Sequence, residues 1–403
     1  MIAHTRYLEA LSRRVLVFDG AMGTNLQRLN LTAADFGGER TYGCNDYLVR
    51  TRPDVVEGIH AAFLNVGCDV IETNTFRSNR ITLREYGLAA RAIEINRAAA
   101  QLARRVADRF ATPAQPRFVA GSIGPSGLLP SSSDPALSNI TFAELADVFR
   151  EQAIGLITGG VDLLLIETSQ DILEVKAAIH GLRQAFQETG VRLPIQAQVT
   201  LDTSGRMLLG TDIAAALVTL EALDVDVVGL NCSTGPEHMY EPARYLGEHS
   251  HLPVSIIPNA GLPINDGSGH ALYPLQPAPM AHDLHTFVVD FGVDVVGGCC
   301  GTTPDHLRAI IDALGEQRER HEELALVPDR NGWPRLRRVR TAAVPRSFVS
   351  SAMRAVPLRQ DPPPTLIGER INAQGSRKVK RLLLAEQYDA ILESARGQGD
   401  GGA

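Results

Sequence analysis

The 403-residue sequence has only five cysteines, no long apolar run and no strongly basic region. Five cysteines are too few for the disulfide framework of a secreted protein, so we expect them to serve packing, metal binding or catalysis. No apolar stretch reaches the roughly 18 residues that a membrane-spanning helix needs. The N-terminal segment is also too polar, before its short apolar run, to be a secretion signal. We therefore expect a cytoplasmic protein with no membrane partner.

The charge composition excludes another class of partner. The formal net charge is −7, and lysines and arginines are spread through the chain, so nucleic acid is not an expected partner. The one short basic run, "RLRRVR" at 335–340, is interpreted as part of a solvated linker. With 44% hydrophobic and 21% charged residues, the composition is typical of a soluble protein with one large domain and an additional segment.

Four segments share one pattern, in which a small residue or an acid, an Asp and four or five apolar residues precede polar groups or thiols. Continuous apolar runs of this length are typical of strands buried on both faces of a parallel sheet. Four further apolar segments fill the gaps between them. The expected strands therefore lie in 15–20, 67–76, 118–125, 160–169, 195–200, 224–233, 254–261 and 292–301.

Helical patterns lie between the expected strands. Those at 53–67, 142–160, 171–190, 210–223 and 304–317 carry Asp or Pro near the start and mostly Gly near the end, as helix caps predict. Eight strands alternating with helices predict an α/β fold, a (β/α)8 TIM barrel, over residues 1–320. The alternative is a doubly wound open sheet. No G-x-G-x-x-G follows the first strand, but that excludes only the dinucleotide-binding version of such a sheet.

The C-terminal fifth of the chain has a different character. Residues 321–364 are charged and Pro-rich, so we expect a linker there. Residues 365–403 are expected to form a short stub with one strand, a loop and one amphipathic helix, with "GQGDGGA" as a terminus that does not continue the helix. These elements are too few for an independent core.

The candidate site follows from the barrel, because functional groups of this fold lie on the loops after the C-terminal ends of the strands. Adjacent Cys299 and Cys300 are poorly placed to form a disulfide with each other. Cys232 follows another strand, so all three thiols share one rim and form the ligand set of a zinc site with an open position. Buried thiols that only fill the core are the alternative. The other candidate residues at strand ends are Asp19, Gly20, Asn74, Glu167 and Asn259.

The charge of such a site indicates its chemistry. Three thiolates and Zn²⁺ sum to a net negative charge, which makes the metal a poor acid toward water and argues against a hydrolase. A fourth thiolate, from a substrate, would stay deprotonated and nucleophilic, so we predict alkylation of a bound thiol. Asp19 and Glu167 are expected to pair with an ammonium group, although a helix cap is the alternative for each acid. Backbone amides of "DGAMGT" and "GSIGPSG" are expected to receive a carboxylate.

The motifs "FDGAMGTNLQ", "IETNTF", "IETSQDILEVKAA", "GLNCSTGP", "PNAGLP" and "VGGCCGTTPDHL" resemble the zinc barrel of the homocysteine S-methyltransferase family. The resemblance covers about residues 8–320 and is closest to the cobalamin-dependent methionine synthase branch of that family. It implies that Cys232, Cys299 and Cys300 bind zinc and that homocysteine thiolate takes the fourth position. It also implies that Asp19 and Glu167 hold the amino group, and that Asn259 lends an oxygen to zinc when homocysteine is absent. Gly20 and Asn74 complete the expected substrate-binding set.

The tail resembles a different part of the same branch. "LIGERINAQGSRKVKRLL" at 366–383 is similar to the opening of a folate (pterin)-binding barrel, but the sequence contains neither the rest of that barrel nor a D-x-H-x-x-G cobalamin motif. Glu369 and Asn372 match the folate motif and are expected to bind nothing here. The expected methyl donor is methylcobalamin, carried by a cobalamin- or folate-binding partner or domain outside this sequence. Two alternatives stay open: a stand-alone enzyme using S-methylmethionine, S-adenosylmethionine or betaine, and a non-catalytic remnant that binds homocysteine or zinc.

Overall fold

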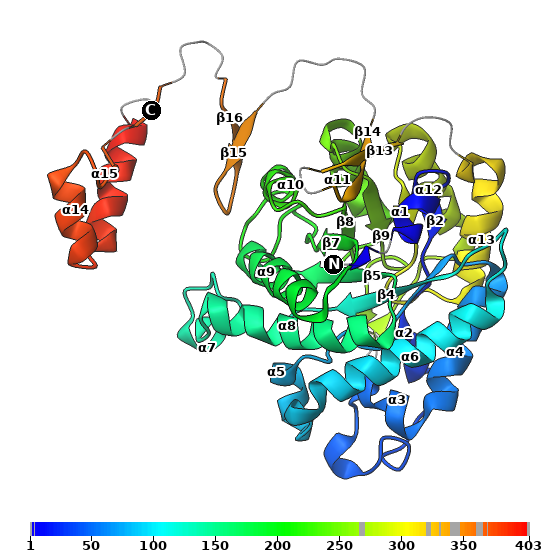
Figure 1. The fold of residues 1–403 in the computed structure, drawn as a ribbon. Coiled ribbons are helices and arrows are strands. Elements are labelled where there is room, and N and C mark those ends of the chain that lie inside the picture. The colour runs from blue at the N-terminus through cyan, green and yellow to red at the C-terminus, as the bar shows by residue number, and fades with distance from the viewer. Residues whose placement is uncertain are drawn as a thin grey trace. The chain divides into compact units, whose positions relative to one another are not determined.

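The structure, a computed structural model, describes residues 2–3, 5–265, 271–319, 324–329, 332–338, 347–359, 366–368 and 370–400. Its main feature is an eight-stranded parallel barrel in the strand order β2-β12-β9-β8-β7-β5-β4-β3 (Figure 1). A parallel bridge between Phe18 and Val70 brings the two end strands together. The predicted TIM barrel and its eight strands are thus confirmed. The strands are β2 (Leu16–Val17), β3 (Val70–Glu72), β4 (Phe118–Ile123), β5 (Leu163–Ser169), β7 (Ile195–Val199), β8 (Val227–Asn231), β9 (Val254–Ile257) and β12 (Val295–Val296).

Helices alternate with these strands and cover the outside of the barrel (Figure 1). Their ends carry the caps that the sequence predicts: Asp171 and Asp212 cap the starts of helices, and Gly67 and Gly160 end helices in the left-handed conformation. The main helices are α4 (Pro53–Val66), α6 (Ala92–Phe110), α8 (Phe142–Gly159), α9 (Ile172–Thr189), α10 (Ile213–Ala222), α11 (Pro236–His249), α12 (Pro277–Phe291) and α13 (Pro304–Leu314). The shorter ones are α2 (Met22–Gln27), α3 (Leu48–Thr51), α5 (Arg80–Leu83) and α7 (Pro135–Ser138).

The core has two layers because successive residues of a strand point to opposite faces. On β3, Ile71 packs outward into the layer between strands and helices, whereas Val70 packs into the barrel interior. The interior is closed at its N-terminal end by α1 (Arg6–Leu11). The ring of Tyr7 packs edge-on against Phe118 at 5.8 Å, and its hydroxyl donates to Gln196 Oε1 at 2.8 Å. This end of the barrel is therefore filled by packed side chains.

A β-hairpin, β13 (Leu324–Pro328) and β14 (Pro334–Arg338), follows the last barrel helix. Trp333 is 4% exposed and its indole donates to the buried Asp226, while Arg338 forms an ion pair with the buried Asp294. Arg335 is also 4% exposed. The interpretation of "RLRRVR" as a solvated linker is therefore wrong for Arg335–Arg338, because Arg335 and Arg338 form ion pairs with Asp224 and Asp294 and Leu336 packs in the core.

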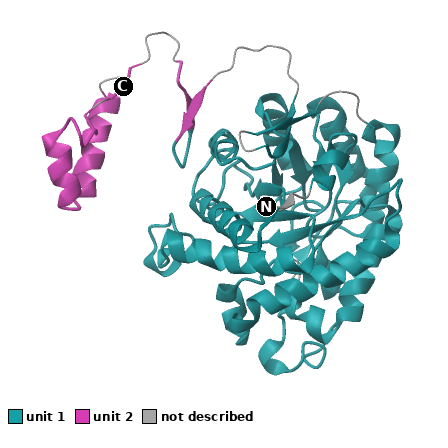
Figure 2. Cartoon of the chain, in the orientation of Figure 1, with its two compact units in different colours: residues 1–341, 351–354 teal, residues 342–350, 355–403 magenta. Residues whose placement is uncertain are grey.

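The chain divides into two compact units (Figure 2): residues 1–341 with 351–354, and residues 342–350 with 355–403. The second unit contains an antiparallel pair, β15 (Phe348–Ser350) and β16 (Ala355–Pro357), and two helices, α14 (Arg377–Leu384) and α15 (Tyr388–Asp400). The minor strands of the first unit are β1 (Ile2–Ala3) with β6 (Val191–Arg192), and β10 (Ile264–Asn265) with β11 (Ala271–Leu272).

The stub differs from its prediction in three ways. Residues 366–368 form no strand, two helices replace the expected single helix, and α15 continues through the "GQGD" of the expected terminus. The break has a local cause: Glu386 adopts a left-handed φ of 53°, and the N–H of Gln387 donates back to the carbonyl of Leu382, as in a Schellman motif. Asn372 is exposed, and Glu369 lies outside the described residues.

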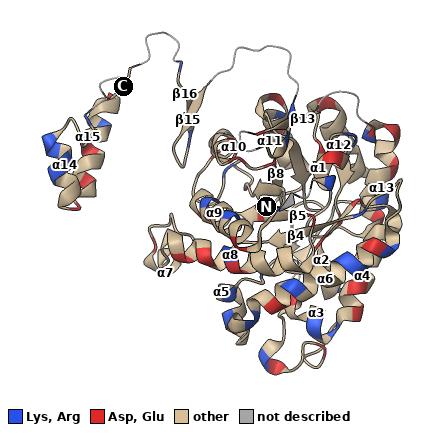
Figure 3. Ribbon diagram, in the orientation of Figure 1, with Lys and Arg blue, Asp and Glu red and all other residues tan. Residues whose placement is uncertain are grey.

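Lysines and arginines are interspersed with acids along the barrel helices (Figure 3). In the part of the chain that the structure describes, no helix combines the length and the apolar character needed to cross a bilayer.

Candidate zinc and substrate site

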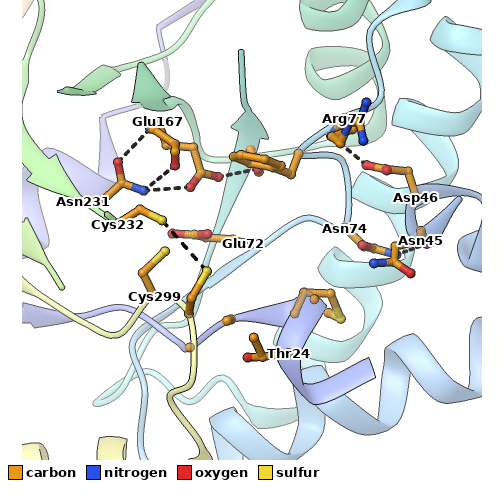
Figure 4. A pocket seen from close by; sticks show the side chains of 18 of the residues that line it. Thr24, Asn45, Asp46, Glu72, Asn74, Arg77, Glu167, Asn231, Cys232 and Cys299 are labelled. Atoms are coloured by element: carbon orange, nitrogen blue, oxygen red, sulfur yellow. Dashed lines mark hydrogen bonds between the residues drawn. The ribbon is translucent and has the colours of Figure 1, made fainter. Parts of the chain in front are cut away.

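A cavity of about 410 Å³ opens at the C-terminal ends of the barrel strands (Figure 4). It is lined by residues from most of the strand ends, so segments far apart in the sequence meet there. Of the residues predicted from the sequence, Asp19, Gly20, Asn74, Glu167, Cys232, Cys299 and Cys300 line the cavity. Asn259 is 2% exposed and lies behind the lining, next to Cys300.

The three predicted cysteines form one cluster. Their Sγ atoms all lie within 4.8 Å of one another, and those of Cys232 and Cys300 are 3.9 Å apart. Cys232 directly follows β8, and the pair Cys299 and Cys300 follows β12. Cys44 and Cys68 are buried and belong to the outer core layer.

Backbone conformation aims the three thiols at a common point. Cys232 adopts a φ of 60°, in the left-handed region that non-glycine residues rarely occupy, and its N–H donates to the carbonyl of Ile257. On the other loop, Gly301 has a φ of 82°, and a Cβ there would lie 2.3 Å from the Cβ of Tyr273. Such strained or side-chain-free positions persist at functional sites because the surrounding structure fixes them.

The donor set fits a zinc ion. Sulfurs bound tetrahedrally to one zinc at about 2.3 Å lie about 3.8 Å apart, which is close to the separation of Cys232 and Cys300. Hydrogen bonds from Cys232 and Cys299 lower the pKa of Cys300 to about 3, whereas hydrogen bonds to Cys232 and Cys300, together with burial, raise the pKa of Cys299. Three thiols this close cannot all ionise unless a cation joins them. A soft divalent metal ion would supply that cation.

Buried acids lie beside the thiols. The two oxygens of Glu167 accept hydrogen bonds from Ser122 Oγ at 2.5 Å and from Asn231 Nδ2 at 3.1 Å. Both oxygens of Asp19 accept from the backbone N–H of Glu72, at 3.2 Å each. Burial raises the pKa of Glu167 to about 7, and burial together with the charge of Glu167 raises the pKa of Asp19 despite that hydrogen bond. Each carboxyl group would therefore gain from a cation in the cavity.

A bulge in β5 sets the direction of Glu167. The pairing of β5 with β7 shifts register between Ile166 and Ser169, and Thr168 adopts a φ of 56°. The N–H of Thr168 donates to Asn231 Oδ1 at 2.7 Å, which locks the end of β5 to the end of β8. The acid from one strand is thereby fixed beside the cysteine that follows another.

Gly20 and Asn74 have structural partners in addition to their place in the lining. A Cβ on Gly20 would lie 2.5 Å from Thr302 Oγ1, so only glycine fits. Asn74 donates its Nδ2 to the carbonyl of Asn45 at 2.8 Å and thus joins the β3 end to the loop before α3. The segment 20–24 of "DGAMGT" lines the cavity, whereas of "GSIGPSG" only Ser122 does so.

Sequence reasoning assigned no role to several other lining residues. Glu72 ends β3 as Glu167 nearly ends β5, so the rule that selected Glu167 also selects Glu72. Asn231 and Ser122 hold Glu167; Asn231 ends β8, whereas Ser122 lies within β4. Tyr273 comes from the segment between β9 and α12, where no strand pattern points to it.

The fold and the site together define an α/β barrel of the (β/α)8 class whose strand ends carry buried acids and a thiol cluster that could hold a metal ion. The profile of the homocysteine S-methyltransferase family matches residues 16–314, and the chain belongs to that family.

Curated relatives agree with this assignment, and a solved structure shares the fold. The chain is 43% identical to a methionine synthase of Mycobacterium leprae over 407 aligned residues, and 42% identical to a methionine synthase of Mycobacterium tuberculosis over 399. Each alignment covers 99% of this chain but only 31% of the relative, so the chain spans about a third of their length. The metallated crystal structure of the homocysteine methyltransferase MmuM from Escherichia coli has the same fold, with a TM-score of 0.60 and 21% identity. That match covers 76% of this chain and 98% of MmuM.

Proposed function

We propose that the chain transfers a methyl group to the sulfur of homocysteine, giving methionine, with the substrate thiol held at a zinc ion on Cys232, Cys299 and Cys300. The observation that carries the proposal is the convergence of three thiols and buried acids in one cavity at the strand ends. Family membership supports the choice of homocysteine among thiol amino acids.

The three cysteines would hold zinc and leave one position of its tetrahedron open. When bound there, zinc lowers the pKa of a substrate thiol and keeps the resulting thiolate nucleophilic. Asp19 and Glu167 bind the ammonium group through their remaining lone pairs, and the Gly20–Thr24 segment faces the carboxylate. The substrate sulfur then attacks the methyl carbon, whose bond to the donor breaks with its electron pair remaining on the donor.

The methyl donor in this proposal is methylcobalamin, supplied by a cobalamin-binding protein or domain outside this chain. Two observations support it: the long relatives of the chain are named methionine synthase, and the 366–383 segment resembles the opening of a folate-binding barrel. The cavity of about 410 Å³ is larger than homocysteine and leaves room above the thiols for a reacting methyl group.

The first test is zinc content per chain, by elemental analysis of protein purified under reductant. About one zinc per chain is expected in the wild type, with loss in Cys232→Ser and retention in Cys68→Ala, which removes a thiol outside the cluster. Folded wild-type protein that takes up no zinc contradicts the proposed centre.

The second test is a panel of methyl donors with the zinc-loaded chain. Methionine is expected from homocysteine and methylcobalamin, free or protein-bound. Methionine from S-methylmethionine, S-adenosylmethionine or betaine alone would replace the proposed donor. Homocysteine binding without turnover of any donor would identify a binding remnant instead.

A further inference from the structure

Four acids line the cavity, and one of them, Asp46, accepts the backbone N–H of Arg77 at 3.0 Å. Of the other three, two already bind the protein. Asp19 accepts the backbone N–H of Glu72 on both oxygens, and Glu167 accepts Ser122 on one oxygen and Asn231 on the other. These hydrogen bonds fix the two acids in place and occupy part of their capacity. They leave open which carboxylate makes the main contact with a substrate cation.

Glu72 differs from the other two acids. Within the described part of the chain, no hydrogen bond or ion pair reaches its carboxylate, although its own N–H donates to Asp19. The alternation of β3 explains where the side chain goes: Ile71 packs outward, so Glu72, like Val70, points inward and reaches the cavity at the strand end. Figure 4 shows it projecting into the same space as the thiols.

The cavity offers these acids little cationic compensation. Arg77 is the only lysine or arginine in the described lining, and its guanidinium pairs with Glu85 at 3.1 Å while remaining about half exposed. Glu72 is partly exposed to the cavity and not fully buried. A carboxylate that faces a cavity without a hydrogen bond or an ion pair among the described residues is available to a ligand that supplies both a positive charge and donors. An α-ammonium group carries both a positive charge and three donors.

We propose that Glu72 binds the ammonium group of the substrate and makes the site selective for amino-acid thiols over thiols that lack an amino group. This inference rests on the proposed function, since it assumes a thiol amino acid as the substrate. Asp19 and Glu167 complete the ammonium subsite, and Glu72 is the member whose carboxylate is free to turn toward the ligand.

The test compares two ligands by isothermal titration into the zinc-loaded full chain: homocysteine and 4-mercaptobutanoate, which keeps the thiol and the carboxylate but lacks the amino group. The variants are Glu72→Gln, which keeps the shape and removes the charge, and Glu188→Gln, a control on the exposed side of α9. Zinc content is measured for each protein. Glu72→Gln is expected to weaken homocysteine binding about 10- to 100-fold, the range for a hydrogen bond to a charged group, and to leave 4-mercaptobutanoate binding within about threefold.

Three results overturn the proposal in distinguishable ways. Unchanged homocysteine binding in Glu72→Gln shows that the carboxylate makes no contact. An equal loss for both ligands, or a loss of zinc, assigns Glu72 a structural role. A wild-type chain that binds zinc but neither thiol contradicts the proposed function itself, and this inference with it.

Discussion

The backbone N–H of Cys300 donates to Oδ1 of Asn259 at 3.0 Å, so the loop after β9 holds the cysteine pair that follows β12. Asn259 was expected to offer its oxygen to zinc when homocysteine is absent. In the structure that oxygen accepts the N–H of Cys300, one of the proposed zinc ligands, and only its remaining lone pair would be available for a metal. The loops of two neighbouring strands thus form one support for the sulfur cluster.

Substitution of Asn259 is expected to weaken the metal centre without unfolding the barrel. Asn259→Ala removes the acceptor for Cys300 N–H, and loss of an outer partner of a metal ligand typically costs about 10- to 100-fold in metal affinity. Competition of the zinc-loaded protein with a chromogenic chelator measures the change. The exposed Asn139 provides the control, as Asn139→Ala, and wild-type affinity in Asn259→Ala would contradict the role given to this hydrogen bond.

Gly301 is expected to tolerate no side chain. Gly301→Ala would place a Cβ 2.3 Å from Tyr273 Cβ on a backbone with φ of 82°, so we expect a cost of roughly 1–3 kcal/mol and reduced zinc content. Thermal unfolding and elemental analysis measure the two effects. Gly58→Ala is the matched control, because Gly58 lies exposed in α4 with open space around its Cβ position and should gain stability from alanine.

His60 is expected to make the barrel less stable in acid. Both ring nitrogens are buried without a hydrogen-bond partner among the described residues, and burial lowers the pKa of His60 to about 4. Between pH 6.5 and 4 the unfolded chain therefore binds a proton that the folded chain does not. This contribution to stability is complete above about pH 6.5 and is lost as the pH falls toward 4.

Replacing His60 should remove this pH dependence. Urea unfolding at pH 7.5 and 4.5 is expected to show that the pH drop costs the wild type roughly 2 kcal/mol more than it costs His60→Leu. Substitution of the exposed His251 by leucine provides a control with the wild-type dependence. Parallel pH profiles for the wild type and His60→Leu would show that His60 is not the group that titrates.

Arg338 is expected to be essential for the stability of the first compact unit. Arg338→Ala removes the cation that pairs with the buried Asp294, and breaking such a pair from one side typically costs about 3–5 kcal/mol. Trp333, the only tryptophan of the sequence, lies in the same hairpin, so its fluorescence follows unfolding directly. Arg354→Ala at an exposed position is the control. An unchanged unfolding midpoint for Arg338→Ala would place the hairpin outside the cooperative unit.

The barrel and the cysteine cluster were predictable because both depend on patterns within single strands. Buried parallel strands are continuous apolar runs, and their C-terminal ends meet on one rim, so Cys232, Cys299 and Cys300 converge whatever the loop details. The hairpin at 324–338 was not predictable in this way. Its charged, Pro-rich composition is typical of a linker, and its order depends on contacts of Trp333 and Arg338 with acids more than 40 residues away in sequence.

Within the site, strand position was enough to predict where the acids lie, but not which of them accept hydrogen bonds from the protein. Asp19, Glu72 and Glu167 all end or follow strands, yet only the structure shows which carboxylates the protein already binds. The break between α14 and α15 could not be predicted from a glycine, because Glu386 takes the left-handed position that glycine usually fills.

The junction between β2 and β3, where Phe18 pairs with Val70, is spanned by Asp19 accepting the N–H of Glu72. Asp19 and Glu72 therefore line the cavity from the two strands at which the barrel closes. In the proposed site, a ligand bound by both acids would link β2 to β3, and a substitution of Asp19 would remove a ligand contact together with a hydrogen bond between these two strands. The proposal therefore gives the carboxylate of Asp19 two roles, one in ligand binding and one in the closure of the barrel.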